Sequence, residues 1–507
     1  MSGPGEHDLA VLAEQWIDRV GDYDMLLFEG TWHSSAQIME RARRAAAGLV
    51  GIGIEPGDRV IVLTMNTPEV FVGYHAIWRA GAVVTPVIFL QTPPELRHIL
   101  EDSGARAAIV SPELIPLVTA AAEGLDLGLV VAGDVPDGVD ALSFAELERS
   151  EPGEIVPRAD EDMSALLYTG GTTGRAKGVM LSHRALWEAG SGMAAVAETM
   201  EARRSLLPLP LSHAFGLNVL IAGLHAQKQQ VSVMQRWFDP QGWLELVQEH
   251  RLQSSPVVPS MMQMLLDLPY QDYDLGSLES FGSGGAPLLP ALRDKVEKAF
   301  GVTILEGYGC TETSAIVTAS TVAESRPGSV GKPAPHAEVA ILDPAGQPVA
   351  TGEEGEICVR GLGVMMGYWN APDLTAQTIV DGWLHTGDVG RLDEDGYLYV
   401  VDRVKDLIIR GGFNVFPRDV EDALLAHDAV AAAAVVGRPD EKSGEEVVAV
   451  VALHPGMTAD PEELMEFARG RLARYKYPRE VRVVDAVPVT SVGKTDRKAV
   501  REMVRGG

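Results

Sequence analysis

Apolar residues in the first third of the chain alternate between short continuous runs and runs with helical spacing. The continuous runs predict strands, and the helically spaced runs predict amphipathic helices between them. Ser34 and Ser35 are candidate caps for the first of these helices, which ends at Gly51, and Thr92 precedes two prolines in a later helix. Such alternation predicts a parallel sheet with helices on both faces. The predicted strands are 58–65, 83–89 and 107–111, and the predicted helices are 36–50, 69–82 and 92–104.

The same alternation returns between residues 163 and 316, and the pattern changes after about Ser329. There, short apolar runs lie between turns rich in glycine, proline and aspartate, which predicts antiparallel hairpins. After Arg403 the order of elements predicts a compact α+β unit. The hairpin runs are 337–343, 355–361 and 396–402; the α+β unit has a hairpin at 406–416, helices at 417–427 and 460–475, and strands at 429–436 and 445–453.

Composition narrows the classes of function. The 507 residues, 46% of them apolar, allow roughly three domains and a sizeable core. The formal net charge of −29 repels phosphate backbones and anionic lipid, so we expect no nucleic-acid partner. The N-terminus is acidic where a signal peptide is basic, and no apolar run is long enough for a membrane span. Two cysteines, Cys310 and Cys358, are too few for a disulfide framework, which favours a reducing cytoplasm.

The strongest local signal is the glycine-rich segment YTGGTTGRAKGV at 168–179. Its glycines leave backbone amides free to face an anion, its threonines add hydroxyl groups, and Lys177 adds a positive charge for phosphate. Because Gly178 and an apolar run follow Lys177, the segment is predicted to join two strands rather than to open a helix. An ordinary glycine-rich hairpin with an exposed lysine is the alternative. The candidate phosphate-binding residues are Thr169, Gly170, Gly171, Thr172, Thr173, Gly174 and Lys177.

Further motifs follow in order, and with them the whole chain resembles the adenylate-forming superfamily of acyl-CoA synthetases, peptide-synthetase adenylation domains and firefly-type luciferases. The resemblance implies that a carboxylate and ATP give an acyl-AMP and pyrophosphate, and that a thiol, usually that of CoA, then displaces AMP. The motifs are PLSHAFGLN (210–218), GSGGAP (282–287), GYGCTETS (307–314), GEICVRG (355–361), GWLHTGD (382–388), DRVKDLIIRGGFNVFP (402–417) and TSVGKTDR (490–497).

The resemblance also implies a domain organisation. We expect an α/β fold with a large N-terminal domain of doubly wound sheets and a small β-barrel-like subdomain at 1–404, followed by a small, mobile α+β C-terminal domain at 405–507. Lys405 would be the hinge on which the C-terminal domain swings between the two half-reactions. Gly411 and Gly412 resemble residues that border a tunnel for the pantetheine arm of CoA. Lys494 resembles a mobile lysine that bridges the α-phosphate and the substrate carboxylate.

For the nucleotide, the resemblance implies further roles. Glu312 resembles the carboxylate that binds Mg²⁺, together with Thr172. Thr311 would bond the α-phosphate or the acyl carboxylate, and Tyr308 would stack on adenine. A surface glutamate and a core tyrosine are the alternatives. The adenine pocket would be lined by Gly285, Ala286 and Pro287, and the ribose hydroxyls would be held by Asp388 and Arg403.

For the acid, His213 and Phe215 resemble the wall and the gate of the acyl pocket. A buried, hydrogen-bonded core histidine is the alternative for His213. With Gly282 and Gly284 as its floor, the pocket is expected to be roomy and apolar. No acidic residue stands at the family position that binds the ammonium group of an amino acid, so amino acids are disfavoured as substrates.

The phosphate loop departs from the family pattern. Gly170 stands where a serine is expected, and Ala176 stands where a proline is expected. Losing a hydroxyl donor to phosphate would weaken pyrophosphate binding by about 1–3 kcal/mol, and losing the proline would loosen the loop. An apolar Ile-Phe-Leu at 88–90 also replaces a polar segment, and Val489 replaces a basic residue. The residues left in place are Lys177, Glu312, Asp388, Arg403 and Lys494.

The predicted function is an ATP- and Mg²⁺-dependent ligase that joins a hydrophobic, even bulky, carboxylic acid to CoA. The changes at Gly170 and Ala176 leave open an enzyme specialised for thioester formation from an acyl-AMP made elsewhere. An adenylating enzyme that loads a carrier protein and an inactive nucleotide-binding scaffold are further alternatives. A luciferase-like oxygenase shares the implied fold, but no sequence feature favours it. The identity of the acid and the oligomeric state stay open.

Overall fold

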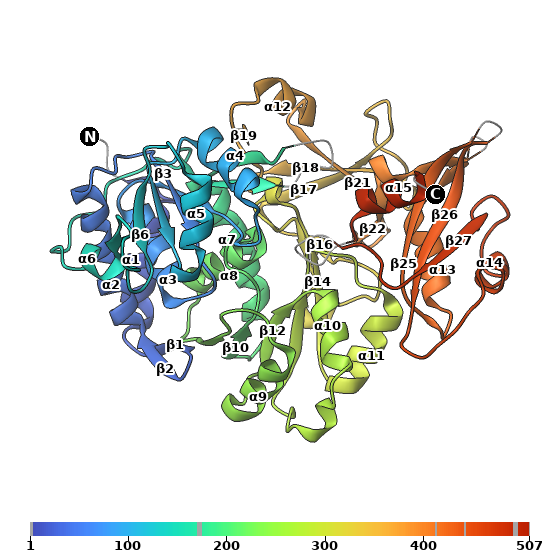
Figure 1. Cartoon of the computed structure of the whole chain (residues 1–507), viewed down its shortest axis with the longest axis horizontal. Coiled ribbons are helices and arrows are strands. Elements are labelled where there is room, and N and C mark those ends of the chain that lie inside the picture. The colour runs from blue at the N-terminus through green and yellow to red at the C-terminus, as the bar shows by residue number, and fades with distance from the viewer. Residues whose placement is uncertain (1–3, 170–174, 411–412, 441–442, 490–494, 506–507) are drawn as a thin grey trace. The chain divides into compact units, whose positions relative to one another are not determined.

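The computed structural model describes residues 4–169, 175–410, 413–440, 443–489 and 495–505 (Figure 1). The chain forms two units. The first consists of Met1–Gly285, Leu292–Val339 and Val359–Leu384. The second consists of Ala286–Ala291, Ala340–Cys358 and His385–Gly507. Within the described ranges, no helix is long and apolar enough to cross a membrane.

Eight strands of the first unit, counted over the described residues, form a sheet that is parallel from β8 to β7 and antiparallel at β9 and β19. The antiparallel strands β8 and β9 lie on either side of the glycine-rich segment, as the sequence predicts, and Thr169 lies opposite Lys177. In spatial order the strands are β19 (Gly367–Tyr368), β9 (Lys177–Ser182), β8 (Met163–Thr169), β4 (Val83–Pro86), β3 (Arg59–Leu63), β5 (Ala107–Val110), β6 (Gly128–Val131) and β7 (Leu142–Ser143).

Helices cover both faces of this sheet (Figure 1). Along β3, Val60 and Val62 pack in a core with α1, α2, α3, α7 and α8, whereas Ile61 and Leu63 pack in a core with α4 and α5. Because successive side chains of a strand point to opposite faces, this alternation confirms the predicted sheet with two covered faces. The helices are α1 (Leu9–Val20), α2 (Ser35–Gly51), α3 (Pro68–Arg79), α4 (Pro93–Ser103), α5 (Ile115–Ala121), α6 (Phe144–Leu147), α7 (His183–Glu198) and α8 (Ala214–His225).

A second sheet of the first unit is parallel from β1 to β14 and antiparallel at its ends. In spatial order its strands are β16 (Lys332–Pro333), β15 (Thr318–Ala319), β14 (Thr303–Tyr308), β13 (Ser280–Ser283), β12 (Ser254–Val257), β10 (Arg204–Leu207), β11 (Val231–Met234), β1 (Asp24–Phe28) and β2 (Thr31–Ser34). The helices that follow in the chain are α9 (Pro240–His250), α10 (Pro259–Leu266), α11 (Pro290–Phe300) and α12 (Pro372–Thr378). Two parallel sheets in one unit agree with the predicted doubly wound architecture.

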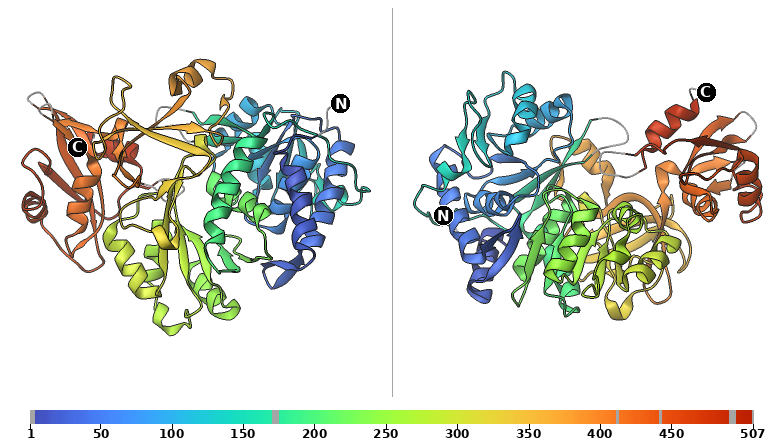
Figure 2. Two further views of the ribbon diagram at one scale, coloured as in Figure 1. Left: turned by 180° about the vertical axis from the view of Figure 1, so that it is seen from behind. Right: turned by 60° about the horizontal axis from the view of Figure 1, so that its bottom comes forward.

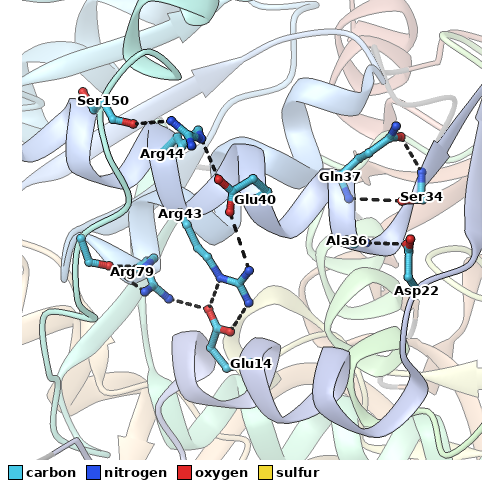
Figure 3. A network of polar contacts seen from close by, with 11 residues as sticks. Glu14, Asp22, Ser34, Ala36, Gln37, Glu40, Arg43, Arg44, Arg79 and Ser150 are labelled. Atoms are coloured by element: carbon cyan, nitrogen blue, oxygen red, sulfur yellow. Dashed lines mark hydrogen bonds and ion pairs between the residues drawn. The ribbon is translucent and has the colours of Figure 1, made fainter.

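Local polar contacts fix the N-terminal helices of the first unit (Figure 3). Ser34 caps α2, as the sequence predicts, and it also forms a capping box with Gln37. Glu14 of α1 accepts hydrogen bonds from Arg43 of α2 and from Arg79 of α3, each at 2.5 Å. One carboxylate therefore ties three helices together.

The chain passes between the two units within β17 (Ala337–Leu342), β18 (Gly355–Gly361) and β21 (Trp383–Leu392). These strands form a sheet with β20 (Ile379–Val380) and β22 (Leu398–Arg403). β21 and β22 pair antiparallel, which agrees with the antiparallel pairing predicted for the run at 396–402.

The last part of the second unit is the predicted α+β fold, with helices on both faces of one sheet (Figure 2). Val435 and Val447 pack with α13 and α14, whereas their neighbours Val436 and Val448 pack with α15. The elements are β23 (Ile408–Arg410), β24 (Phe413–Val415), α13 (Pro417–Leu425), β25 (Val430–Asp440), β26 (Gly444–Leu453), α14 (Pro461–Arg469), β27 (Glu480–Val484) and α15 (Arg497–Arg505).

Several predicted boundaries are wrong. The helix expected over 69–82 ends at Arg79, and the strand expected over 429–436 continues to Asp440. The helix expected over 460–475 ends at Arg469, because Gly470 caps it. The strand expected over 83–89 ends at Pro86. Val87 beyond this end is still buried in the core with α4 and α5, so the apolar run is longer than the strand.

Candidate functional site

The glycine-rich segment joins the ends of β8 and β9. Thr169 and Lys177, the last residue of β8 and the first of β9, are half-buried. The predicted phosphate-binding residues between these strands lie outside the described residues: Gly170, Gly171, Thr172, Thr173 and Gly174. The predicted strand–loop–strand arrangement is confirmed, whereas phosphate binding by the segment stays a prediction.

Side chains of α4 form hydrogen bonds on both sides of the glycine-rich segment. The Tyr168 hydroxyl donates to Asp102 Oδ2 at 2.7 Å, and burial raises the pKa of Tyr168, so the tyrosine stays a neutral donor. On the other side, His98 Nε2 donates to the Ala176 carbonyl at 2.9 Å. His98 and Asp102 are four residues apart on one helix and therefore share a face. Sequence reasoning missed both residues, because nothing in a helical pattern marks a contact across more than sixty residues.

Glu312 lies in a tight turn after β14. The turn consists of the 3₁₀ helix Thr311–Thr313 followed by Ser314 and Ala315, whose φ angles of 53° and 73° are left-handed. The Glu312 carbonyl accepts the amide of Met365 at 2.8 Å, and its Oε1 accepts the Tyr368 hydroxyl at 2.9 Å. Thr311 is half-buried in the same turn. The structure thus gives Glu312 a fixed position in the first unit.

Lys177 is brought to the same tyrosine. Its Nζ lies 5.6 Å from the centroid of the Tyr368 ring. Tyr368 belongs to β19, which pairs antiparallel with β9 and places Tyr368 opposite Val179. Sequence reasoning singled out Lys177 and Glu312 but missed Tyr368, which contacts both.

The residues predicted to line the acyl pocket also lie close together. His213 is half-buried and caps α8, and its Nδ1 accepts the amide of Phe215 at 3.3 Å. Its role in the acyl pocket stays a prediction beside the alternative of a hydrogen-bonded core histidine. A Cβ added to Gly284 would lie 3.4 Å from Phe215 Cε1 and 3.7 Å from the Gly307 carbonyl oxygen. The motifs at 210–218, 282–287 and 307–314 therefore meet around Phe215 and Gly284.

The remaining residues predicted to line the adenine pocket or the floor of the acyl pocket lie within or shortly after β13 and β14. Gly282 is half-buried within β13, and Gly285 adopts a left-handed φ of 77° just beyond it. Ala286 and Pro287 follow directly in the chain, and half-buried Tyr308 ends β14. The carboxyl ends of parallel strands are where open α/β sheets bind their ligands, so these positions agree with a nucleotide pocket.

In the second unit, Asp388 and Arg403 face each other across the β21–β22 pair. Arg403 Nε lies 3.0 Å from Asp388 Oδ1, with the aspartate side chain 10% exposed and the arginine side chain 52% exposed. The predicted ribose pair is thus a cross-strand ion pair.

Glu356 fixes the turn that leads to Asp388. One of its carboxylate oxygens lies 2.8 Å from His385 Nδ1, and the other accepts the Gly387 amide at 3.0 Å. Among the described residues, the donor atoms of Glu356, Cys358 and His385 lie close enough together to hold a metal ion. Burial raises the pKa of the Cys358 thiol to about 12.

The predicted hinge residue, Lys405, lies in the 3₁₀ helix Val404–Asp406 and is exposed. Asp406 next to it is buried and accepts a hydrogen bond from Arg501 of α15 at 2.6 Å. Helix α15 begins at Arg497, just after the predicted catalytic Lys494. Lys494 itself and the predicted tunnel residues Gly411 and Gly412 lie outside the described residues.

Comparisons with known proteins agree with this fold and these motifs. Residues 13–369 match the family described as AMP-binding enzyme, and residues 419–494 match the AMP-binding enzyme C-terminal domain. A feruloyl-CoA synthase from an Amycolatopsis species is 38% identical over 476 residues, covering 93% of this chain and 94% of that protein. A long-chain-fatty-acid–CoA ligase from Bacillus subtilis strain 168 is 35% identical over 517 residues, covering 96% and 92%.

A solved structure extends the similarity to three dimensions. The anthranilate CoA ligase AuaEII, crystallised in complex with anthranoyl-AMP, matches with a TM-score of 0.92 and 28% identity, covering 99% of this chain and 98% of that chain. The expected large N-terminal domain and separate small C-terminal domain are thereby confirmed. Each of these matches spans nearly the whole length of both chains. The chain therefore belongs to the AMP-binding enzyme family, as an adenylate-forming acyl-CoA synthetase.

Proposed function

We propose that this enzyme activates a hydrophobic carboxylic acid, bulky ones included, as an acyl-AMP and transfers the acyl group to CoA. The observation that carries the proposal is the convergence of Lys177 and Glu312 on Tyr368, since phosphate chemistry needs a cation and a metal-binding carboxylate close together. The meeting of Phe215 with Gly284 supports an apolar acid. The names of the relatives, a feruloyl-CoA synthase and a long-chain-fatty-acid ligase, support the same class.

In the first half-reaction, a carboxylate oxygen of the acid attacks the α-phosphorus of ATP, and the bond to the pyrophosphate oxygen breaks. Lys177 binds the phosphates, and Thr311 donates to the α-phosphate or to the acyl carboxylate. Lys494 bridges the same two groups and stabilises the negative charge of the transition state. His213 and Phe215 hold the acid.

Glu312 fits a role as a Mg²⁺ ligand, with Thr172 as its partner. The hydrogen bond from Tyr368 uses one carboxylate oxygen of Glu312, and carboxylate oxygens are the ligands that Mg²⁺ prefers. Bound Mg²⁺ would neutralise charge on the triphosphate.

The nucleoside part of ATP is held by a second set of residues in this proposal. The ion-paired Asp388 and Arg403 bind the ribose hydroxyls, and Tyr308 stacks on adenine. The adenine pocket is completed by Gly285, Ala286 and Pro287.

In the second half-reaction, the CoA thiol loses its proton and its sulfur attacks the acyl carbonyl, which releases AMP. We propose that a domain at 405–507 turns about Lys405 relative to 1–404 between the two steps, so that Lys494 leaves and the pantetheine arm enters past Gly411 and Gly412. A cytoplasmic location is also proposed, supported by Cys310 and Cys358, neither of which is in a disulfide bond.

The test combines ATP–pyrophosphate exchange with thioester formation over aromatic, medium-chain, long-chain and polycyclic acids. We expect exchange, AMP release and thioester formation with at least one of these acids. Lys494→Ala should abolish exchange and still form thioester from a synthetic acyl-AMP. Full exchange by this variant would refute the role of Lys494.

The loop composition favours a second candidate, an enzyme that makes thioesters from an acyl-AMP supplied to it. Gly170 lacks the hydroxyl that could donate to phosphate. Robust pyrophosphate exchange with a cognate acid would exclude this candidate. Offering CoA and a pantetheinylated carrier protein side by side would identify the natural acceptor.

A further inference from the structure

Tyr368 lies between the two charged residues of the candidate adenylation site without being one of them. It is 9% exposed and ends β19, and its backbone amide donates to Thr375 Oγ1 at 2.8 Å. Gly367 and Tyr368 pair with Met180 and Val179 of β9, which begins at Lys177. The tyrosine is therefore held in place by its backbone and by burial.

The hydroxyl of Tyr368 orients Glu312. It donates to Oε1 at 2.9 Å, and the neighbouring Met365 amide holds the Glu312 carbonyl. Carboxylates that bind metals are themselves usually oriented by such hydrogen bonds.

The ring of Tyr368 contacts Lys177. A separation of 5.6 Å between Nζ and the ring centroid is within the range of a cation–π interaction. One side chain thus contacts a carboxylate through its hydroxyl and an ammonium group through its ring, although Lys177 and Glu312 are far apart in the chain.

We propose that Tyr368 is a positioning residue that sets the spacing of Glu312 and Lys177 and thereby the affinity for Mg²⁺–ATP. The inference rests on the proposed function, because it takes Glu312 as the Mg²⁺ ligand and Lys177 as the phosphate ligand. The hydroxyl acts on the metal through Glu312, and the ring acts on the phosphates through Lys177. Removing each part should therefore have a different effect.

The test measures equilibrium binding of α,β-methylene-ATP to the full chain over a range of Mg²⁺ concentrations. For Tyr368→Phe, which loses only the hydroxyl, we expect the Mg²⁺ concentration at half-saturation to rise about tenfold. Binding of the analogue in EDTA should stay unchanged. Tyr368→Leu, which also loses the ring, should in addition weaken binding in EDTA by about threefold. A purely structural role would not separate the two effects.

Tyr399 offers a matched control. Its hydroxyl donates to Asp393 Oδ2 at 3.2 Å, and Arg391 Cζ lies 4.1 Å from its ring centroid, so it too contacts a carboxylate and a cation. Tyr399→Phe removes the same kind of hydrogen bond outside the candidate site. We expect it to leave the Mg²⁺ dependence of analogue binding unchanged.

A double-mutant cycle keeps the inference testable even if Tyr368→Phe is less stable. Glu312→Gln keeps the acceptor for the hydroxyl but removes the charge, so the further change Tyr368→Phe should no longer alter the Mg²⁺ dependence. If Tyr368→Phe behaves like wild type, or shifts the Mg²⁺ dependence equally in the Glu312→Gln background, the inference is refuted. If wild type itself binds the analogue without any Mg²⁺ dependence, the proposed metal role of Glu312 fails first.

Discussion

Replacing Arg293 should destabilise the first unit strongly, because this arginine neutralises a buried carboxylate. Arg293 of α11 is 4% exposed, and its Nη1 lies 2.9 Å from Oε1 of Glu306, which is 7% exposed on β14. Its Nη2 also donates to the Ile304 carbonyl at 3.2 Å and to Ser325 Oγ at 2.8 Å. Removing one partner of a buried ion pair typically costs about 3–5 kcal/mol. We expect Arg293→Met to lower the free energy of unfolding by this amount.

Two comparisons make the prediction sharp. The double variant Arg293→Met/Glu306→Leu should recover most of the lost free energy of unfolding, since both charges of the buried Arg293–Glu306 pair are then absent. Arg360→Met serves as the matched control: its pair with Glu338 has a short 2.6 Å contact, but the two side chains are 50% and 58% exposed. Arg360→Met should lower the free energy of unfolding by less than about 1 kcal/mol.

The assay is urea unfolding followed by far-UV circular dichroism at neutral pH. Equal losses for Arg293→Met and Arg360→Met would refute the reasoning. So would a double variant that is as unstable as Arg293→Met alone. Because β14 leads directly to Thr311 and Glu312, the same variants show how far the binding of ATP depends on this strand.

Three further predictions concern the pocket, the ribose pair and pH. Gly284→Val should push into Phe215 and lower kcat/KM for bulky acids more than about tenfold while sparing small ones, as an acid panel would show. Asp388→Asn, which removes the charge facing Arg403, should raise KM for ATP about tenfold or more and leave KM for the acid unchanged. Burial lowers the pKa of His75 to about 4, so the folded state resists a proton that the unfolded chain accepts below about pH 6.5. The free energy of unfolding should therefore decrease as the pH is lowered through this range. His75→Gln should reduce by about 2 kcal/mol the free energy of unfolding that is lost between pH 8 and pH 5, as measured by urea titration.

Much of the fold could be predicted because its signals are local. Ser34 and Thr92 begin helices with capping boxes, and strands alternate with helices at a spacing that requires a parallel sheet. Where a boundary depends on one residue, the pattern was less reliable. Helical spacing continues past Gly470, yet the helix ends there.

The charged candidate residues could be singled out because each lies in a recognisable motif, and the roles assigned to them stay predictions. Lys177 starts β9, Glu312 follows β14, and Asp388 and Arg403 pair across β21 and β22. The residues that orient them gave no such signal. Tyr368 lies in a short apolar run, and only the pairing of β19 with β9 brings its hydroxyl to Glu312.

Contacts of this kind also change how the departures in the phosphate loop are interpreted. The sequence predicted that alanine in place of proline at 176 would loosen the loop. In the structure, however, the Ala176 carbonyl accepts a hydrogen bond from His98, and Tyr168 before the loop donates to Asp102 on the same face of α4. Helix α4 thus restrains the chain on both sides of the glycine-rich segment, at Tyr168 and at Ala176. The hydrogen bond at Ala176 restrains the position at which a proline ring would otherwise restrain the backbone. The remaining departure, Gly170, removes a hydroxyl donor. We therefore expect any deficit in the first half-reaction to arise from weaker pyrophosphate binding and not from a displaced Lys177.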